Sequence, residues 1–229
     1  QQPTPAASGC CTPPPPPPPR ASQRPRPMAA GAADRAGGVQ QAAEVGSWED
    51  FCAVEGPEAR FTQWLRLQAG STWAAVVDHE FTDQLADGRV EAAAMRRYLI
   101  QDHRFLDALV VLLASAVAAA RSLEDRIPGC QFLALLTSKE NTYFERSFEA
   151  LGVSPEERAA GPLEAATSEF DALMRSAAAS GELHRMLAVL VVAEWSYLSW
   201  GERVLPRRSS EPFWCSEWVD LHSGAHFRG

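Results

Sequence analysis

The segment that decides the fold runs from residue 95 to residue 121 and reads MRRYLIQDHRFLDALVVLLASAVAAAR. Its apolar and aromatic side chains recur at steps of three and four residues, the period of a helix with one face in a core. Positions 95, 98, 99, 102, 105, 106 and 109 form that face, and all are apolar or aromatic except Asp102. The segment therefore predicts a long core helix with a carboxylate on its apolar side.

Outward from this segment, the chain from residue 61 has the same helical period and lacks the alternating pattern of strands. We expect further helices over about 61–87, 131–151, 166–180, 183–204 and 213–227, with breaks at Asp87-Gly88 and Pro128-Gly129. Gly152 has the position of a helix C-cap, and Ser154-Pro155 that of an N-cap and first turn. The sequence thus predicts an all-α protein built as a helical bundle.

The composition excludes several classes of protein. The 229 residues carry 21 basic and 29 acidic side chains, a net charge of −8 with no basic run, so we expect no nucleic-acid partner. The longest apolar run, Ala108 to Ala120, is shorter than the ~20 residues that span a bilayer, so no membrane partner is expected. The five cysteines are scattered without a Cys-x-x-Cys pair, which indicates free thiols in a reducing compartment.

Residues 1–46 differ from the rest. They hold most of the 17 prolines and almost no bulky apolar side chain, so we expect a disordered leader rich in Pro, Ala and Arg. Three interpretations stay open: sequence upstream of the true start, an organelle transit peptide, or a proline-rich ligand. The first is favoured, with Met28 as the first methionine, so the expected location is the cytoplasm, with organelle targeting by the tail as the alternative.

A second carboxylate interrupts another apolar face. In the expected helix 183–204, Glu194 lies among Leu187, Leu190, Val191, Tyr197 and Leu198. A carboxylate on a core face is costly unless it is paired or hydrogen bonded. A buried ion pair with an arginine, or faces rotated toward the rim, would explain each acid alone. Two such acids near aromatic side chains favour an aromatic pocket with a polar floor.

Motifs for other chemistries are missing from the sequence. None of the five histidines follows a glutamate by three residues, and no His-Glu-x-x-His occurs, so a helical metal site is not predicted. No glycine-rich phosphate loop lies in the helical part. We therefore expect a pocket without metal or cofactor for a planar ligand that bears an amine, because a carboxylate binds an amino group and aromatic faces enclose a ring.

Three stretches match one family in order and at similar spacing. They are His79-Glu80-Phe81 with Asp87-Gly88 and Tyr98-Leu99-Ile100-Gln101-Asp102, then Met186 to Tyr197, then Trp218-Val219-Asp220-Leu221-His222-Ser223. Over about Trp64 to Phe227 the chain resembles the thiaminase II (TenA) family. The resemblance implies a heme-oxygenase-like helical bundle, hydrolysis of thiamin breakdown products, and a homo-oligomer, either a tetramer or a dimer.

The same resemblance implies roles for individual residues. Asp102 matches the aspartate that holds the pyrimidine amino group, Phe105 and Phe170 match aromatic positions beside the ring, Tyr197 matches a tyrosine that supports the reacting centre, and His222 falls where many members have a ring-stacking tyrosine. Ala193 occupies the column of the family's nucleophilic cysteine. Glu194 follows it, which resembles the cysteine-lacking branch that hydrolyses amino- or formylamino-pyrimidines.

A second departure concerns the end of the chain. Family members continue past the Trp218 segment into further helices, so the resemblance implies that the domain 47–229 lacks its last helices and would expose apolar surface.

The leading hypothesis is a metal-free hydrolase in thiamin pyrimidine salvage, in which Glu194 activates water and protonates the departing amine. The alternative is a catalytically silent pyrimidine-binding or interaction protein on the same fold. A cofactor-type oxygenase is disfavoured because paired metal ligands are missing from the sequence.

Overall fold

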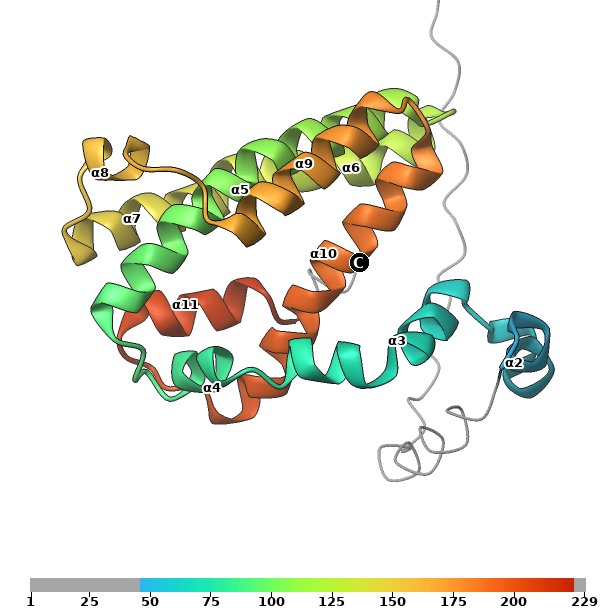
Figure 1. The fold of residues 1–229 in the computed structure, drawn as a ribbon, viewed down its shortest axis with the longest axis horizontal. Helices are drawn as coiled ribbons and strands as arrows, with labels where there is room; N and C mark the ends of the chain where they lie inside the picture. Colours follow the sequence, from blue (N-terminus) through green and yellow to red (C-terminus); the bar gives the residue numbers. More distant parts are fainter. Residues whose placement is uncertain (1–45, 225–229) are drawn as a thin grey trace, which may run out of the picture. The chain divides into compact units, whose positions relative to one another are not determined.

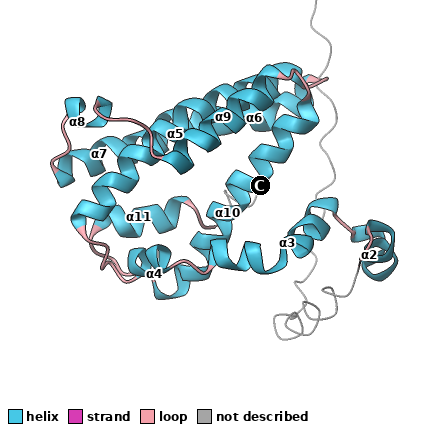
Figure 2. Cartoon of the chain, in the orientation of Figure 1, coloured by secondary structure: helices cyan, strands magenta, loops and turns pink. Residues whose placement is uncertain are grey.

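The computed structural model describes residues 46–224, and every regular element in that range is helical (Figure 2). The first helices are α2 (Trp48–Glu55), η1 (Gly56–Glu58), α3 (Phe61–Val77), α4 (Glu80–Ala86) and α5 (Ala92–Ala119). The next are α6 (Leu123–Leu135), η2 (Leu136–Glu140), α7 (Asn141–Leu151), α8 (Pro155–Ala159) and α9 (Ala165–Ala179). The last are α10 (Leu183–Val204), η3 (Leu205–Arg207) and α11 (Phe213–Leu221). The all-α prediction is confirmed, whereas the predicted leader falls on residues outside the described range.

Helix α5 lies at the centre of the bundle. It packs along α9 and α6, and it also contacts α7 and α10 (Figure 1). Helix α10 contacts the α5–α9 pair with one end, and it contacts α4 and α11 with the other. It therefore connects these two groups of helices. The buried residues of α5 include Met95, Leu99, Asp102, Phe105 and Leu109, all on the face that the sequence predicted. No helix among residues 46–224 has both the length and the apolar character needed to cross a membrane.

The interior consists of two hydrophobic clusters. The first is formed by α4, α7, α11 and the start of α5, with Leu99, Phe144 and Trp218 among its members. The second is formed by α9, the start of α10 and the rest of α5, and it includes Phe105 and Leu190. On α5, Asp102 lies between Leu99 of the first cluster and Phe105 of the second. The carboxylate therefore lies where the two clusters meet.

The single helix predicted over 61–87 is wrong. Helix α3 ends at Val77, and α4 starts after His79, whose Nδ1 accepts a hydrogen bond of 3.1 Å from the Phe81 amide. This cap satisfies one of the amides that a helix N-terminus leaves without a partner, so α4 can begin directly after His79.

The predicted break at Pro128-Gly129 is also wrong. Both residues lie inside α6, which starts five residues before the proline with Ser122 as its N-cap. A proline inside a helix costs about 3 kcal/mol, so packing must offset it. Gly129 lies so close to α5 that an added Cβ would be 2.5 Å from Val117 Cγ2. The close packing of α6 on α5 explains why α6 continues through Pro128 and Gly129.

The predicted caps at Gly152 and Ser154 are confirmed, whereas the predicted end of the final helix is wrong. The cap at Gly152 is confirmed, with a left-handed backbone at φ 67° and a hydrogen bond from the Val153 amide to the Phe148 carbonyl. The Oγ of Ser154 accepts from the amide of Glu157, as an N-cap should. The final helix, predicted to residue 227, ends at Leu221 instead.

A glycine fixes how the end of α11 meets α10. A Cβ added to Gly201 would lie 2.3 Å from the carbonyl oxygen of His222, and only glycine permits this approach. We expect Gly201→Ala to lower the free energy of unfolding by about 1–3 kcal/mol, the usual cost of overpacking. A thermal melt measures this, with Gly46→Ala as the control because nothing lies within 4 Å of that added carbon. Equal melting temperatures for the two variants would contradict the prediction.

Candidate active site

Asp102 is held by a tyrosine from the neighbouring helix. The residue is 9% exposed, and its Oδ1 accepts a hydrogen bond of 2.6 Å from the hydroxyl of Tyr197 on α10. Burial raises the pKa of Asp102 to about 6, and the hydroxyls of Tyr197 and Tyr98 oppose that rise. At neutral pH this carboxyl is therefore mostly ionised. Tyr98 is in turn held by Trp218, whose Nε1 donates to the tyrosine oxygen at 2.9 Å.

Glu194 lies at the edge of the buried face of α10. That face runs through Met186, Leu190 and Ala193, while Leu187, which we predicted to belong to it, is 46% exposed. The buried face of α10 is thus shifted by about one position along the chain from the predicted face. Glu194 is half-buried beside Ala193. Burial, and next the charge of Asp102, raise the pKa of Glu194 to about 8. At neutral pH this carboxyl mostly carries its proton.

Neither acid is explained by an ion pair with an arginine. Within residues 46–224, no arginine or lysine forms a salt bridge with Asp102 or Glu194. The described part of the chain also contains no hydrogen bond to the carboxyl of Glu194. A buried pair with an arginine is therefore not what keeps these two acids on their helix faces.

A third carboxyl, Glu140, was missed by the sequence analysis. It is the last residue of η2, a π-helical turn, and it is half-buried. Burial is the largest cause that raises the pKa of Glu140 to about 8, followed by the charges of Asp102 and Glu194. The signal was present, because Glu140 follows the buried Leu136 by four residues and precedes the buried Tyr143 by three.

The three carboxyls line one cavity. It is narrow, with a volume of about 10 Å³, roughly the room needed by one water molecule. Its wall consists of Asp102, Phe105, Leu106, Leu109, Leu136, Glu140, Glu194, Tyr197 and His222. A wider cleft of about 440 Å³ shares Asp102, Phe105 and Tyr197 with it and adds Phe170, whose ring centroid is 5.1 Å from that of Phe105. The structure therefore brings together all six residues predicted for the site.

His222 closes the cavity as an uncharged ring. It is 5% exposed, and its Nδ1 lies 2.7 Å from the Trp218 carbonyl, which only an N–H on that nitrogen can satisfy. Burial lowers the pKa of His222 to about 4, so the ring is neutral at physiological pH. Its centroid is 4.8 Å from that of Tyr197 and 4.6 Å from that of Trp218. The histidine thus offers an aromatic surface, and its predicted contact with substrate stays a prediction.

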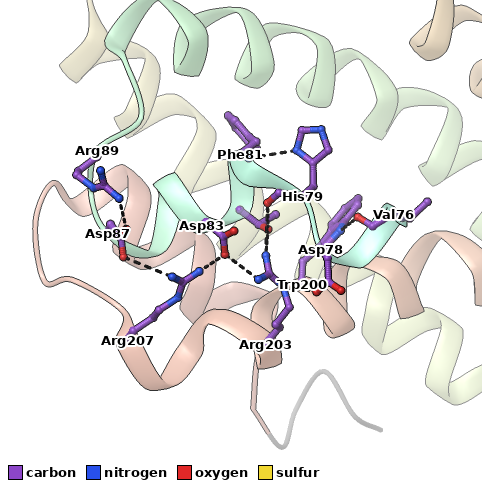
Figure 3. Close-up of polar contacts among 11 residues, drawn as sticks. Val76, Asp78, His79, Phe81, Asp83, Asp87, Arg89, Trp200, Arg203 and Arg207 are labelled. Carbon is purple, nitrogen blue, oxygen red and sulfur yellow. Dashed lines mark hydrogen bonds and ion pairs between the residues drawn. The ribbon is translucent and has the colours of Figure 1, made fainter. Parts of the chain in front are cut away.

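A polar network anchors the wall of the wider cleft. Arg203 on α10 donates to Asp83 at 2.7 Å and to Thr82 at 2.6 Å, and Arg207 also pairs with Asp83 (Figure 3). Trp200 donates to the carbonyl of Val76 at 2.6 Å, just before the turn that carries His79. These contacts hold α4 against α10. They fix His79 and Phe81, which line the cleft.

Metal ligands are not grouped in this part of the molecule. Among the described residues, no set of three or more His, Cys, Asp or Glu side chains is arranged so that it could hold a metal ion. What the carboxyls of the cavity offer a ligand is hydrogen bonding, negative charge and proton transfer.

Comparison with known proteins assigns the family. Residues 67–229 match the model of the TENA/THI-4/PQQC family, and the chain belongs to that family. Two relatives are each named aminopyrimidine aminohydrolase. The one from Halalkalibacterium halodurans is 25% identical over 170 residues, covering 73% of this chain and 75% of the relative. The one from Bacillus subtilis is 23% identical over 169 residues, covering 74% and 71%. The family predicted from the sequence is confirmed.

Solved structures confirm the fold. A TenA family transcription regulator from Silicibacter sp. TM1040 is similar with a TM-score of 0.66 and 24% identity, covering 76% of each chain. A TenA homologue from Pyrococcus furiosus is similar with a TM-score of 0.64 and 20% identity, covering 74% of this chain and 79% of the other.

The raised pKa of Glu194 makes stability depend on pH. The fold favours the protonated acid, so the stabilisation is complete below the ordinary pKa of 4.5 and is lost as the pH rises through about 8. Glu194→Gln stays neutral, so its melting temperature should match that of the unchanged protein at pH 4.5 and exceed it by at least about 3 °C at pH 9. Melts at both values test this, with the exposed Glu149→Gln as control. A wild type that is the more stable at pH 9 would refute the assignment.

Proposed function

We propose that the protein is a metal-free hydrolase of amino- or formylamino-methylpyrimidines derived from thiamin, and that it acts in pyrimidine salvage. The single observation that carries the proposal is that Asp102, held by the Tyr197 hydroxyl, and Glu194 line the same aromatic cavity. One group suits binding of a ring amine and the other suits proton transfer. The names of the two relatives support the same substrate class.

Binding follows from the charge and shape of the cavity. A carboxylate accepts charge-assisted hydrogen bonds from an amino group, and Asp102 is the ionised acid of the site. Tyr197 donates to one of its oxygens, so the carboxylate has a fixed orientation. Phe105 and Phe170 place two aromatic rings at the junction of cavity and cleft, where a planar pyrimidine can pack against them.

Hydrolysis requires one base and one acid. In its ionised form Glu194 removes a proton from water while the water oxygen attacks the methylene carbon on the pyrimidine. The C–N bond breaks as the C–O bond forms, and the proton taken from water is passed to the departing nitrogen. The products are a hydroxymethylpyrimidine and ammonia from the amino substrate, or formamide from the formylamino substrate, so the reaction needs no oxidant and no covalent enzyme intermediate. A homo-oligomer, dimer or tetramer, stays a prediction from the resemblance.

Substitution of Glu194 separates catalysis from binding. Glu194→Gln should lower kcat by at least about 10²-fold, the usual contribution of an acid–base group, while the Kd for the aminomethylpyrimidine is unchanged. Asp102→Asn should instead weaken binding, because the amide lacks the negative charge. Amine release and titration calorimetry measure the two effects.

Glu149→Gln is the matched control, because this glutamate is exposed and lies away from the cavity. Full turnover by Glu194→Gln would refute the mechanism. An unchanged protein that binds the pyrimidine tightly without turnover would favour the silent binding protein.

A further inference from the structure

The cavity contains a carboxyl that the mechanism above does not use. Glu140 comes from the π-helical turn between α6 and α7, whereas Asp102 comes from α5 and Glu194 from α10. All three line the same small cavity. Glu140 is not among the site residues that the sequence predicted, and its position in the cavity is what singles it out.

Packing gives no reason for a glutamate at this position. Its neighbours on the buried side of the chain are Leu136, which is 3% exposed, and Tyr143 and Phe144, which are each 1% exposed. Within the described residues its carboxyl forms no salt bridge and no hydrogen bond. A half-buried acid without such a partner destabilises the fold, and a leucine would suit the surroundings better.

The backbone at Glu140 is irregular in the same place. The turn Leu136–Glu140 is π-helical, so it holds one residue more than an α-helical turn and shifts the direction of the side chains that follow. Single π-helical turns are unfavourable and are often found at functional sites. Here the irregular turn has a carboxyl at its end that faces the cavity.

The titratable groups that share the cavity with Glu140 offer no positive charge to pair with it. The titratable groups that share its cavity are Asp102, Glu194, Tyr197 and His222, and none of them is a cation at neutral pH. The neighbouring Lys139 is exposed, and the side chain of the next residue, Asn141, lies 3.4 Å from the ring nitrogen Nε2 of His103 on α5. The charge of an ionised Glu194 favours the protonated form of Glu140, which raises the pKa of Glu140. Two negative charges in one small cavity are disfavoured, so one of the two glutamates keeps its proton when the other ionises.

We propose that Glu140 is a second acid–base residue of this cavity, which donates the proton to the departing nitrogen while Glu194 takes the proton from water. The inference rests on the proposed hydrolase function and divides its two proton transfers between two residues. As the C–O bond forms and the C–N bond breaks, Glu194 becomes protonated and Glu140 ionised. The free amine and the hydroxymethylpyrimidine leave, and exchange with solvent restores the starting proton positions.

The test compares substrates whose leaving groups differ in their need for a proton. The full 229-residue chain, Glu140→Gln, Glu194→Gln and the control Glu149→Gln are assayed with the aminomethylpyrimidine and with an analogue whose leaving group is 4-nitroaniline. The nitrogen of the aminomethylpyrimidine must gain a proton to leave as ammonia, whereas the nitro group stabilises charge on a departing nitroaniline nitrogen and so lowers its need for a proton. Glu140→Gln should lose about 10²-fold or more in kcat on the amine substrate and recover most of that loss on the nitroaniline substrate. Glu194→Gln should remain defective on both.

The pH profile gives a readout that does not depend on a variant folding. For the unchanged protein, kcat/KM on the amine substrate should rise as Glu194 ionises and fall again as Glu140 ionises. On the nitroaniline substrate the alkaline fall should be absent. Calorimetric binding of the pyrimidine by Glu140→Gln shows that the variant keeps its cavity.

The outcomes distinguish this inference from the function on which it rests. A Glu140→Gln protein with the kcat of the unchanged protein, beside an inactive Glu194→Gln, would overturn the inference and leave the hydrolase function standing. Equal loss by Glu140→Gln on both substrates, or an alkaline fall that persists with nitroaniline, would also overturn it. A lack of amine release by the unchanged protein would overturn the hydrolase function and the inference together.

Discussion

The hydrogen bond between Tyr197 and Asp102 is the contact on which the site depends. It joins α5 to α10, two helices that contribute to both hydrophobic clusters. It also lies where one hydrophobic cluster gives way to the other, so the groups around it are shielded from water while a polar cavity remains. In such surroundings a hydrogen bond to a charged group is stronger than in water, and it fixes the orientation of the carboxylate.

The same surroundings give three acids two different protonation states. Asp102 has hydroxyl donors and a pKa of about 6, so it is the acid that ionises first. Its charge then disfavours ionisation of Glu194 and of Glu140, whose pKa values are raised to about 8. Like charges close together in a poorly hydrated space cannot all ionise, so one anion and two proton carriers result without any cation. This division is what a site needs if it is to bind an amine and also move protons.

Sequence reasoning located most of this site and missed a part for a physical reason. Asp102 and Glu194 interrupt apolar faces of regular α-helices, so the period of 3.6 residues was enough to find them. Glu140 lies at the end of a π-helical turn inside a stretch predicted as one continuous helix, and a regular period does not predict such a turn. The break expected at Pro128 failed because tertiary contact between Gly129 and Val117 overrides a local signal. The break between α3 and α4 at His79 was missed as well, since an imidazole is an uncommon N-cap and does not mark a helix start.

The destabilising acids of the site explain why strong contacts are found elsewhere in the fold. Half-buried acids without ion pairs destabilise the folded state, so other contacts must hold the walls in place. The pairing of Arg203 and Arg207 with Asp83 ties α4 to the end of α10, and the close approach of Gly201 to the His222 carbonyl seats the end of α11 on the same helix. Both contacts act on α10 beyond Tyr197, on the side away from Glu194. These contacts of α10 thus lie next to the segment that carries the unpaired Glu194, as expected where a fold keeps reactive groups at the expense of stability.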